Sequence, residues 1–550
     1  MSEQKKGESP GLWGNTAVFG VCGFFIYKLA VRVGLRLTAL WHVHPWACGI
    51  IALGLVTTTC LIAFGPLWNK ITERNAEKEI AKPDETSVYL GKSIEGEQIN
   101  VKQQYRTTHT QVIGTTVSGK TESVILPWAI RDLETKAGML IIDGKSDKTF
   151  LEKFYAYVVK SGRKSDFRLF SLAHLEPSST FNPLVGGSSY EIAERVFSSF
   201  TFENEYFKNI QYKLFHAVIR LILHDGKVPS FVLVRRLLTD TALLRVWLDR
   251  CYDDDVKYDL VNFLKEPDRE RNEKIGGLDS HLSHFATGEL ATLFNSNESQ
   301  IQMDQVLREN LVCYFQLPSM YYPTLAAATG RLALQCFQNA VSKRHLGLES
   351  KPGFFSCYLD DFQDYIYEGF GALLNKCRSA NVGVVFSHQA LGDLDKVSPA
   401  FKNVVLTNTN IKCVMRTNDP DTCEYFSKSF GTKTAEKTTE RQKTNMLGDS
   451  RTGDGSVREV QEFRFHPNDI RGLGTGEGIV TIPHFKGIKV EKVRFKRRDD
   501  IAPFPLPRVL KEPLSVLKAA VPKTDGASEK TRVVPNDLTP TKETANETNP

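Results

Sequence analysis

The chain has 550 residues, of which 24% are charged and 41% are apolar, and its formal net charge is +6. This length is too great for one compact core, so two or three domains are expected, and the small net charge neither supports nor excludes binding to nucleic acid. The ten cysteines show no C-x-x-C or Cys/His spacing, which argues against a zinc site or a disulfide framework and fits a reducing compartment.

Two apolar segments predict a membrane anchor over residues 1–70. Residues 13–31 are mostly apolar, and residues 45–68 carry no charge. About 20 apolar residues cross a bilayer, so two spans are expected. The competing interpretation of the first segment is a cleaved signal peptide. Its weak small-residue cleavage signal and the basic residues that follow it disfavour that interpretation.

A charged linker is expected over residues 71–100, and after it β-branched runs alternate with helices, the pattern of a mostly parallel α/β sheet. The expected strands, each a short apolar run, are residues 109–113, 138–143, 167–171, 311–316, 354–359, 382–387 and 411–415. Residues 191–304 lack such runs and hold amphipathic stretches, including 204–223 and 232–248, so they predict an inserted all-helical domain. The sheet domain would therefore comprise residues 101–190 and 305–498.

The C-terminal part has weaker signals. Residues 432–460 are polar and predict a flexible excursion, and residues 462–495 predict a hairpin-like region. The basic run 492–498 fits either a nucleic-acid or anionic-lipid contact or a solvated strand. Residues 499–550 are rich in proline and poor in apolar side chains, so a disordered tail is expected.

Residues 114–121, Gly-Thr-Thr-Val-Ser-Gly-Lys-Thr, match the phosphate-binding loop pattern G-x-x-x-x-G-K-[ST]. They lie between an expected strand and a helix expected over residues 122–133, where backbone N–H groups can hold phosphates. The residues expected to bind ATP are Gly114, Thr115, Thr116, Val117, Ser118, Gly119, Lys120 and Thr121. Lys120 would reach the β- and γ-phosphates, and Thr121 would ligate Mg²⁺. The alternative is a decayed loop without hydrolysis.

Val117 is unusual in this loop. Such loops usually carry glycine at this position because the backbone there tends toward positive φ, which strains a β-branched residue by roughly 1–3 kcal/mol. Either the loop adopts a variant shape or it binds nucleotide more weakly than its relatives.

A second motif is the apolar run 354–359, which ends in Asp360 and Asp361. A buried strand would deliver both carboxylates beside the phosphates. Asp360 would hold Mg²⁺, and Asp361 would orient or deprotonate the attacking water. Asp361 is one methylene shorter than the glutamate that most such enzymes carry. The alternative is a strand that ends in a solvated acidic turn.

Other candidate site residues also follow expected strands. Gln389 would sense the γ-phosphate, and Arg416 would act as an arginine finger across a subunit boundary. For each, a surface or paired side chain is the alternative. His388 is interpreted as structural. Asp143 and Lys145 either support the site or form a plain turn.

The order of motifs carries a family resemblance. Two N-terminal spans, the phosphate-binding loop, Ile142-Asp-Gly-Lys145 and Phe181-Asn-Pro-Leu184 precede the helical insertion. Leu359-Asp-Asp-Phe362, Cys377-Arg-Ser-Ala380 and Ser387-His-Gln389 follow it. Over roughly residues 10–495, the chain resembles the type IV coupling proteins of the TraD/TraG family. The resemblance implies a RecA-like domain in a hexameric ATPase that feeds relaxase-bound single-stranded DNA, or protein substrates, into a type IV secretion channel.

The resemblance also assigns roles to individual residues. Lys120 and Thr121 match the family's phosphate and magnesium contacts, and Asp360 matches its second-motif aspartate. Gln389 matches its sensing glutamine, and Arg416 its intersubunit arginine. Val117 and Asp361 depart from the family's glycine and glutamate, which bears on turnover. The tail 499–550 is not matched.

Location and partners follow from the resemblance as well. It implies a multi-pass inner-membrane protein with a cytoplasmic nucleotide domain. The implied partners are copies of itself in a homo-hexamer, inner-membrane secretion components, membrane lipid, single-stranded DNA, and a relaxase–DNA complex or secreted proteins. The basic residues 28–36 between the spans would then lie outside, against the positive-inside rule. The alternative functions are an adaptor ATPase that recruits protein effectors and a chromosome-type DNA translocase.

Overall fold

The computed structural model describes residues 83–346, 353–445, 448–484 and 487–507, and the isolated positions 28, 31, 32, 36, 50 and 54. Apart from isolated positions, the two predicted spans lie outside the described residues. Within the part described, no helix is long and apolar enough to cross a membrane. The chain divides into two compact units, residues 1–106 and 107–550.

The first unit contains an antiparallel hairpin of β1 (Val88–Ser93) and β2 (Gln98–Val101), followed by α3 (Gln103–Arg106). Val88 and Leu90 on β1, and Ile99 and Val101 on β2, are buried. The prediction of a linker over residues 71–100 is therefore wrong for its second half. Apolar side chains on alternate positions give each short strand one buried face, a signal that the surrounding charged residues conceal.

The second unit is built on a mixed sheet with the strand order β13-β12-β9-β3-β8-β7-β4-β6-β5. These strands are β3 (Thr110–Ile113), β4 (Gly138–Asp143), β5 (Phe167–Ser171), β6 (Val312–Gln316), β7 (Phe355–Asp360), β8 (Val382–His388), β9 (Ile411–Met415), β12 (Glu477–His484) and β13 (Gly487–Phe495). From β9 to β5 neighbouring strands are parallel, whereas β12 runs antiparallel to both β9 and β13. The seven predicted strands are confirmed.

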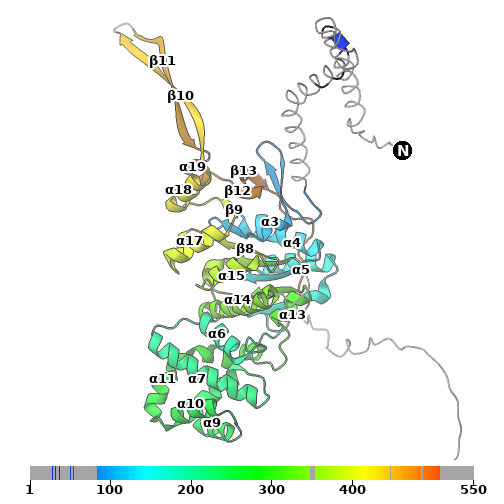
Figure 1. Cartoon of the computed structure of the whole chain (residues 1–550), viewed down its shortest axis with the longest axis vertical. Coiled ribbons are helices and arrows are strands. Elements are labelled where there is room, and N and C mark those ends of the chain that lie inside the picture. Colours follow the sequence, from blue (N-terminus) through cyan, green and yellow to red (C-terminus); the bar gives the residue numbers. More distant parts are fainter. Residues whose placement is uncertain are drawn as a thin grey trace, which may run out of the picture. The chain divides into compact units, whose positions relative to one another are not determined.

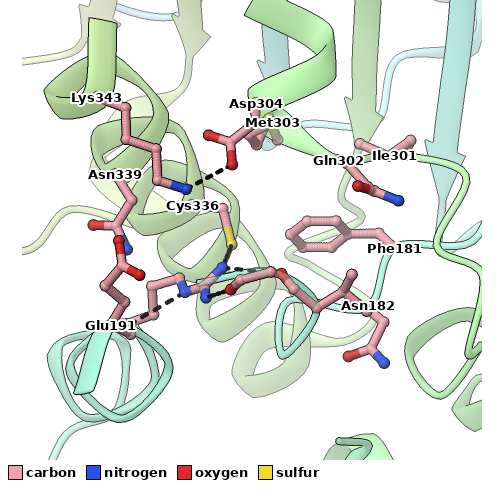
Figure 2. Close-up of a pocket in the computed structure, with 13 residues that line it drawn as sticks. Phe181, Asn182, Glu191, Ile301, Gln302, Met303, Asp304, Cys336, Asn339 and Lys343 are labelled. Carbon is pink, nitrogen blue, oxygen red and sulfur yellow. Dashed lines mark hydrogen bonds and ion pairs between the residues drawn. The ribbon is translucent and has the colours of Figure 1, made fainter. Parts of the chain in front are cut away.

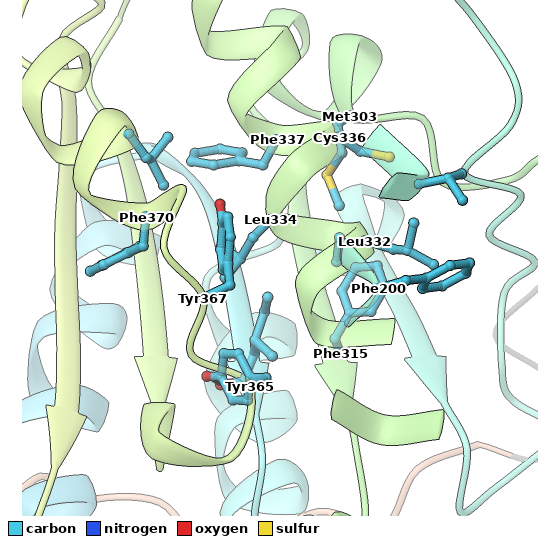
Figure 3. Close-up of a cluster of buried hydrophobic side chains, with 14 of the residues drawn as sticks. Phe200, Met303, Phe315, Leu332, Leu334, Cys336, Phe337, Tyr365, Tyr367 and Phe370 are labelled. Carbon is cyan, nitrogen blue, oxygen red and sulfur yellow. Dashed lines mark hydrogen bonds between the residues drawn. The ribbon is translucent and has the colours of Figure 1, made fainter. Parts of the chain in front are cut away.

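Helices cover this sheet (Figure 1). They are η1 (Thr121–Ile125), α4 (Leu126–Glu134), α5 (Lys148–Lys160), η2 (Lys164–Asp166), α14 (Pro323–His345), η3 (Phe362–Asp364), α15 (Phe370–Cys377), α16 (Gly392–Asp395), α17 (Pro399–Asn408), α18 (Pro420–Ser429) and α19 (Pro467–Arg471). Figure 3 shows how α14 joins the core: Leu332, Leu334 and Phe337 lie among Phe315 of β6 and Phe370 of α15. All five side chains are fully buried, so α14 is held by apolar contact with the sheet and with α15.

Eight helices follow one another between β5 and β6, and no strand interrupts described residues 189–308. They are α6 (Ser189–Ser199), α7 (Glu205–His224), α8 (Phe231–Thr239), α9 (Thr241–Leu248), α10 (Asp254–Lys265), α11 (Asp268–Ala286), α12 (Ala291–Phe294) and α13 (Met303–Arg308). The stretch predicted over residues 232–248 is divided at Asp240. Its carboxylate accepts a hydrogen bond from the Leu243 N–H at 3.0 Å, which caps the start of α9.

The two connections to this helical insertion lie side by side and form what we call the neck. The Phe181 N–H donates to the Leu293 carbonyl at 2.8 Å, and the Ile301 N–H donates to the Thr180 carbonyl at 3.0 Å. Asn182 strengthens the neck because its side-chain amide donates to the carbonyls of Pro229 and Ser296. The insertion thus leaves and re-enters the sheet at neighbouring strands.

Residues 432–460 do not form the predicted irregular excursion. They belong to a two-stranded antiparallel hairpin of β10 (Thr432–Asn445) and β11 (Gly448–Phe463), in which Thr432 pairs with Phe463. The hairpin stands apart from the main sheet in Figure 1. The prediction failed because residues 432–460 are mostly polar, so the sequence has no apolar alternation to mark a strand.

The chain also stays packed beyond residue 498, where the disordered tail was predicted to begin. The Lys153 Nζ atom lies 2.6 Å from an Asp499 carboxylate oxygen, and the Tyr157 hydroxyl donates to Asp500 at 2.7 Å. The Phe504 N–H donates to the carbonyl of Glu152 at 3.3 Å. Charged side chains and one aromatic therefore fix this segment to α5, and residues 508–550 lie outside the described part.

Two buried histidines connect elements of the second unit. The His109 Nε2 atom lies 2.8 Å from the Leu374 carbonyl, and its Nδ1 accepts from the Val384 N–H. His388 bonds Gln111 through Nε2 and the Ala390 carbonyl through Nδ1. Each ring uses one nitrogen as donor and the other as acceptor, which requires the neutral form. Burial lowers the pKa of both histidines to about 4.

We therefore predict that the contribution of these two histidines to stability falls as the pH drops from about 6.5 toward about 4, because protons bind the unfolded histidines first. Each histidine changes the free energy of unfolding by about 3 kcal/mol over this whole pH range. Thermal unfolding at a series of pH values measures the effect. His109→Gln should reduce the slope, whereas substitution of the exposed His174 should leave it unchanged. An equal slope in His109→Gln and the parent chain would contradict the prediction.

Candidate functional site

The predicted phosphate-binding loop joins β3 to η1, and its backbone is held by three neighbouring segments. The Gly114 N–H donates to the His388 carbonyl at 3.3 Å, at the end of β8. The Thr115 N–H donates to the Arg416 carbonyl at 2.9 Å, just after β9. On the other side, the Gly476 N–H donates to the Ser118 carbonyl at 3.0 Å. These bonds fix the loop at the carboxyl edge of the parallel strands.

Glycine is required at two positions of this loop. A Cβ atom at Gly114 would lie 2.7 Å from the Ser118 Oγ, and Gly119 has a φ of +98°. Val117 also lies in the left-handed region, with a φ of 65°, so the expected positive φ is confirmed. Its side chain is 73% exposed, and its carbonyl accepts from the Thr475 hydroxyl at 3.2 Å. Val117 therefore keeps a strained backbone that its neighbours hold in place.

The loop and the second motif meet at Asp360. Thr121 donates its hydroxyl to one Asp360 carboxylate oxygen at 2.6 Å. The other oxygen accepts from the Ser387 hydroxyl and from the Asp361 N–H. Lys120 turns its ammonium toward the loop, 2.7 Å from the Gly114 carbonyl. The two residues predicted to hold Mg²⁺ are thus in direct contact, next to the predicted phosphate lysine.

A cavity of about 430 Å³ opens over these residues. The predicted residues that line it are Thr115, Thr116, Val117, Gly119, Lys120, Thr121, Asp143, Lys145, Asp360, Asp361 and Gln389. Gly114 and Ser118 belong to the loop but are not among the lining residues. The sequence analysis missed five further lining residues: Glu122, Asp147, Phe150, Thr475 and Arg497. Of these, only Arg497 had a sequence signal, the basic run 492–498.

Buried charges give this cavity its electrostatic character. Asp143 and Asp360 lie opposite each other on the paired strands β4 and β7. Burial, together with the charge of Asp360, raises the pKa of Asp143 to about 7, and burial also raises the pKa of Asp360. Burial lowers the pKa of Lys120, while the carboxylates of Asp361 and Asp360 oppose that shift. A divalent cation at this place would stabilise the charged carboxylates.

The donor atoms fit magnesium. Mg²⁺ prefers hard oxygen ligands and keeps several waters and substrate phosphates around it. The Thr121 hydroxyl and the Asp360 carboxylate supply two such oxygens at the cavity wall. Asp143 is less suited because its carboxylate already accepts from the Tyr314 hydroxyl and from the backbone N–H groups of residues 145–147. Asp143 therefore orders the turn after β4.

The remaining predicted site residues take different positions. Gln389 is exposed at the end of β8 and faces the cavity. Asp361, with a φ of 45°, begins the turn after β7. The Arg416 carbonyl accepts from both the backbone N–H and the hydroxyl of Thr115. The half-buried side chain of Arg416 is not among the described residues that line this cavity, so within one chain it lies outside the site.

A second cavity lies at the base of the helical insertion (Figure 2). Arg195 donates there to the Val185 and Gly186 carbonyls and approaches the Cys336 sulfur. Lys343 forms an ion pair with Asp304 at 2.7 Å. The volume of this second cavity, about 40 Å³, suits a water molecule and excludes a nucleotide. The cavity beside the phosphate-binding loop is the candidate functional site because it brings together the loop, Asp360 and Gln389.

A parallel strand, a glycine-bounded loop and a strand-end aspartate that meets the loop threonine define a P-loop nucleotide-binding protein of the α/β class. The chain belongs to the family of type IV secretion coupling proteins: the family described as "Type IV secretory system Conjugative DNA transfer" matches residues 68–524.

Individual relatives are more distant. The Type 4 coupling protein DotL of Legionella pneumophila is 23% identical over 398 residues, covering 61% of this chain and 51% of DotL. The chain thus spans about half the length of that relative. The fold is similar to the unbound bacterial conjugative coupling protein TrwBdeltaN70, with a TM-score of 0.56 and 15% identity over 78% of this chain and 93% of that one. The plasmid coupling protein TrwB in complex with ADP and Mg²⁺ has a TM-score of 0.56 and 16% identity over 78% and 94%.

The strained Val117 generates a prediction about affinity. Val117→Gly should tighten ATP binding by up to about tenfold, since glycine adopts positive φ without strain. The ATP affinity of Val117→Ala should lie between those of the parent chain and Val117→Gly, because alanine keeps a Cβ atom and loses only the branch. Isothermal titration of the three proteins tests the order. Unchanged or weaker binding by Val117→Gly would show that the loop is adapted to valine.

Proposed function

We propose that this chain is an ATP-hydrolysing coupling protein that delivers substrate to a type IV secretion channel. The observation that carries the proposal is the direct contact of Thr121 with Asp360, beside Lys120, in a cavity large enough for a nucleotide. The family and the TrwB-like fold support the same conclusion.

In the proposed reaction, Lys120 and the loop N–H groups hold the β- and γ-phosphates. Thr121 and Asp360 would hold Mg²⁺, which neutralises charge on the phosphates when bound. Asp361 would orient the attacking water or accept its proton, and Gln389 would contact the γ-phosphate. Both side chains line the cavity, as these roles require.

Arg416 is proposed to act on the nucleotide of a neighbouring subunit. Its carbonyl is bonded to the loop of its own chain, whereas its side chain is not one of the described residues around its own cavity. An arginine in such a position can neutralise transition-state charge in trans. This role requires a neighbouring subunit, as the proposed homo-hexamer supplies. Residues 1–70 would anchor the hexamer in the inner membrane, with the nucleotide domain in the cytoplasm.

The favoured cargo is relaxase-bound single-stranded DNA, and recruitment of protein effectors is the second candidate. The helical insertion supports recognition of a protein, because some of its charged side chains form partly exposed pairs that a docking surface can use. Arg235 pairs with Asp279 at 2.7 Å, and Arg220 pairs with Asp253. The insertion would bind the cargo complex, and the sheet domain would hydrolyse ATP to drive transport. A chromosome-type translocase is the third candidate.

Mixing subunits tests the role of Arg416. Arg416→Ala and Lys120→Ala homomers should each lose nearly all ATP hydrolysis, whereas their mixture should recover part of it, because some interfaces combine an intact loop with an intact arginine. Arg494→Ala, which alters an exposed arginine on β13, serves as the control and should remain active. Absence of recovery at every ratio, with mixed assemblies confirmed, would contradict action in trans.

The salt dependence of DNA binding tests the cargo. A motor that moves any strand must hold phosphates rather than read bases, so binding of single-stranded DNA should be independent of sequence and fall steeply with salt. Fluorescence anisotropy with unrelated oligonucleotides at several salt concentrations measures this. A chain that captures a secreted protein but binds no DNA at low salt would select the effector-recruiting alternative.

A further inference from the structure

The segment after β13 is bound to α4 and α5, and one of its residues lines the cavity of the phosphate-binding loop. We call residues 496–504 the strap. Its first anchor is Lys153 of α5, whose ammonium lies 2.6 Å from Asp499 of the strap and 2.7 Å from Glu122 of η1. The Lys153 side chain is only 10% exposed, and its ammonium is held between the two carboxylates. Glu122 directly follows Thr121, so the anchor ties the strap to the phosphate-binding loop.

Further anchors surround the first one. Arg498 donates to Glu134 of α4 at 2.7 Å, and its guanidinium lies 5.4 Å from the centre of the Tyr157 ring. The Tyr157 hydroxyl donates to Asp500 at 2.7 Å, and Phe504 packs against Tyr155. The strap is therefore fixed to α4 and α5. Residues 498 to 500, immediately after Arg497, are each held by side-chain bonds.

Arg497 is the strap residue that faces the cavity. It lines the cavity together with Thr475 and Glu122 and is itself exposed. In the described part of the chain, no hydrogen bond or ion pair is recorded for its side chain, whereas Arg498 forms two ion pairs. The strap thus presents a guanidinium with unused donors to the space where a nucleotide would lie.

The residues that line the cavity indicate how a bound nucleotide would be oriented. Asp360, Asp361 and Gln389 come from the ends of β7 and β8, and Lys120 with Thr121 lies beside them. That side holds the terminal phosphates and Mg²⁺ in the proposed function. The ribose and base would then extend past Glu122, the residue after the loop, which Lys153 links to Asp499 of the strap, and so toward Arg497, which also lines the cavity.

We propose that Arg497 contacts the nucleoside part of the nucleotide bound by its own subunit, and that the strap positions it to do so. The inference rests on the proposed nucleotide site and adds a specificity-determining residue to it. A planar guanidinium can stack on a base and donate to ribose oxygens at the same time. Each nucleotide would then be contacted at its nucleoside part by Arg497 of the subunit that binds it, and at its phosphates by Arg416 of a neighbouring subunit.

The experiment compares three ligands, ATP, ADP and inorganic tripolyphosphate, by titration calorimetry with the full chain. Arg497→Ala should weaken the binding of ATP and of ADP by the same factor, about threefold to tenfold, and leave the affinity for tripolyphosphate unchanged. Arg497→Lys should resemble the alanine variant, because an ammonium cannot stack as a planar guanidinium does. Asp499→Asn, which loosens the strap, should give an intermediate loss. Lys496→Ala, an exposed neighbour outside the cavity lining, should bind as the parent does.

The remaining outcomes are distinguishable. A loss of affinity for ATP alone would show that Arg497 contacts the γ-phosphate. An equal loss of affinity for tripolyphosphate would show that it contacts phosphates in general. Unchanged affinities for all three ligands would show that it does not contact the nucleotide. Each of these overturns the inference while the proposed function stands. Failure of the parent chain to bind ATP would remove the proposed function, and the inference with it. Melting temperatures without ligand confirm that the variants are folded.

Discussion

The site depends on one buried carboxylate, that of Asp360. Burying a charge is unfavourable unless hydrogen bonds or a cation compensate it, and here the donors come from three different places: Thr121 at the end of the loop, Ser387 on β8 and the backbone of Asp361. These donors can meet only if β3, β8 and β7 are adjacent and parallel, as the sheet arranges them. The strand order is thus the geometric condition for the site, where burial raises the pKa of Asp360.

Strain is concentrated around this carboxylate. Val117 and Asp361 both have left-handed backbones although neither is glycine, and both lie at the cavity. Such conformations persist where the surroundings over-determine them. Thr475 and Gly476 bind the loop carbonyls next to Val117, and the Ser387 hydroxyl binds the backbone of Asp361. The strained residues are therefore held by hydrogen bonds to neighbouring segments at the carboxyl edge of the sheet.

The sequence predicts the centre of this molecule better than its periphery. Parallel strands buried on both faces are continuous apolar runs, so β3 to β9 could be recognised, and the meeting of Thr121 with Asp360 follows because carboxyl ends of parallel strands share an edge. The sequence of the β10–β11 hairpin is mostly polar, and β1 and β2 lie in a charged segment, so periodicity could not reveal them. Arg497 was visible only as part of a basic run. Its position over the cavity depends on Lys153 and Glu134, which are distant in sequence, and local patterns carry no such information.

The neck of the helical insertion has a consequence for how the protein can change. Its two connections are bonded to each other, Phe181 to Leu293 and Ile301 to Thr180, and they enter neighbouring strands, β5 and β6. A segment whose ends already meet can be exchanged for another with equally close ends without moving the strands that carry the site. Recombination within this family could therefore transplant insertions between motors, and a chimera with its junctions at the neck is the natural laboratory equivalent.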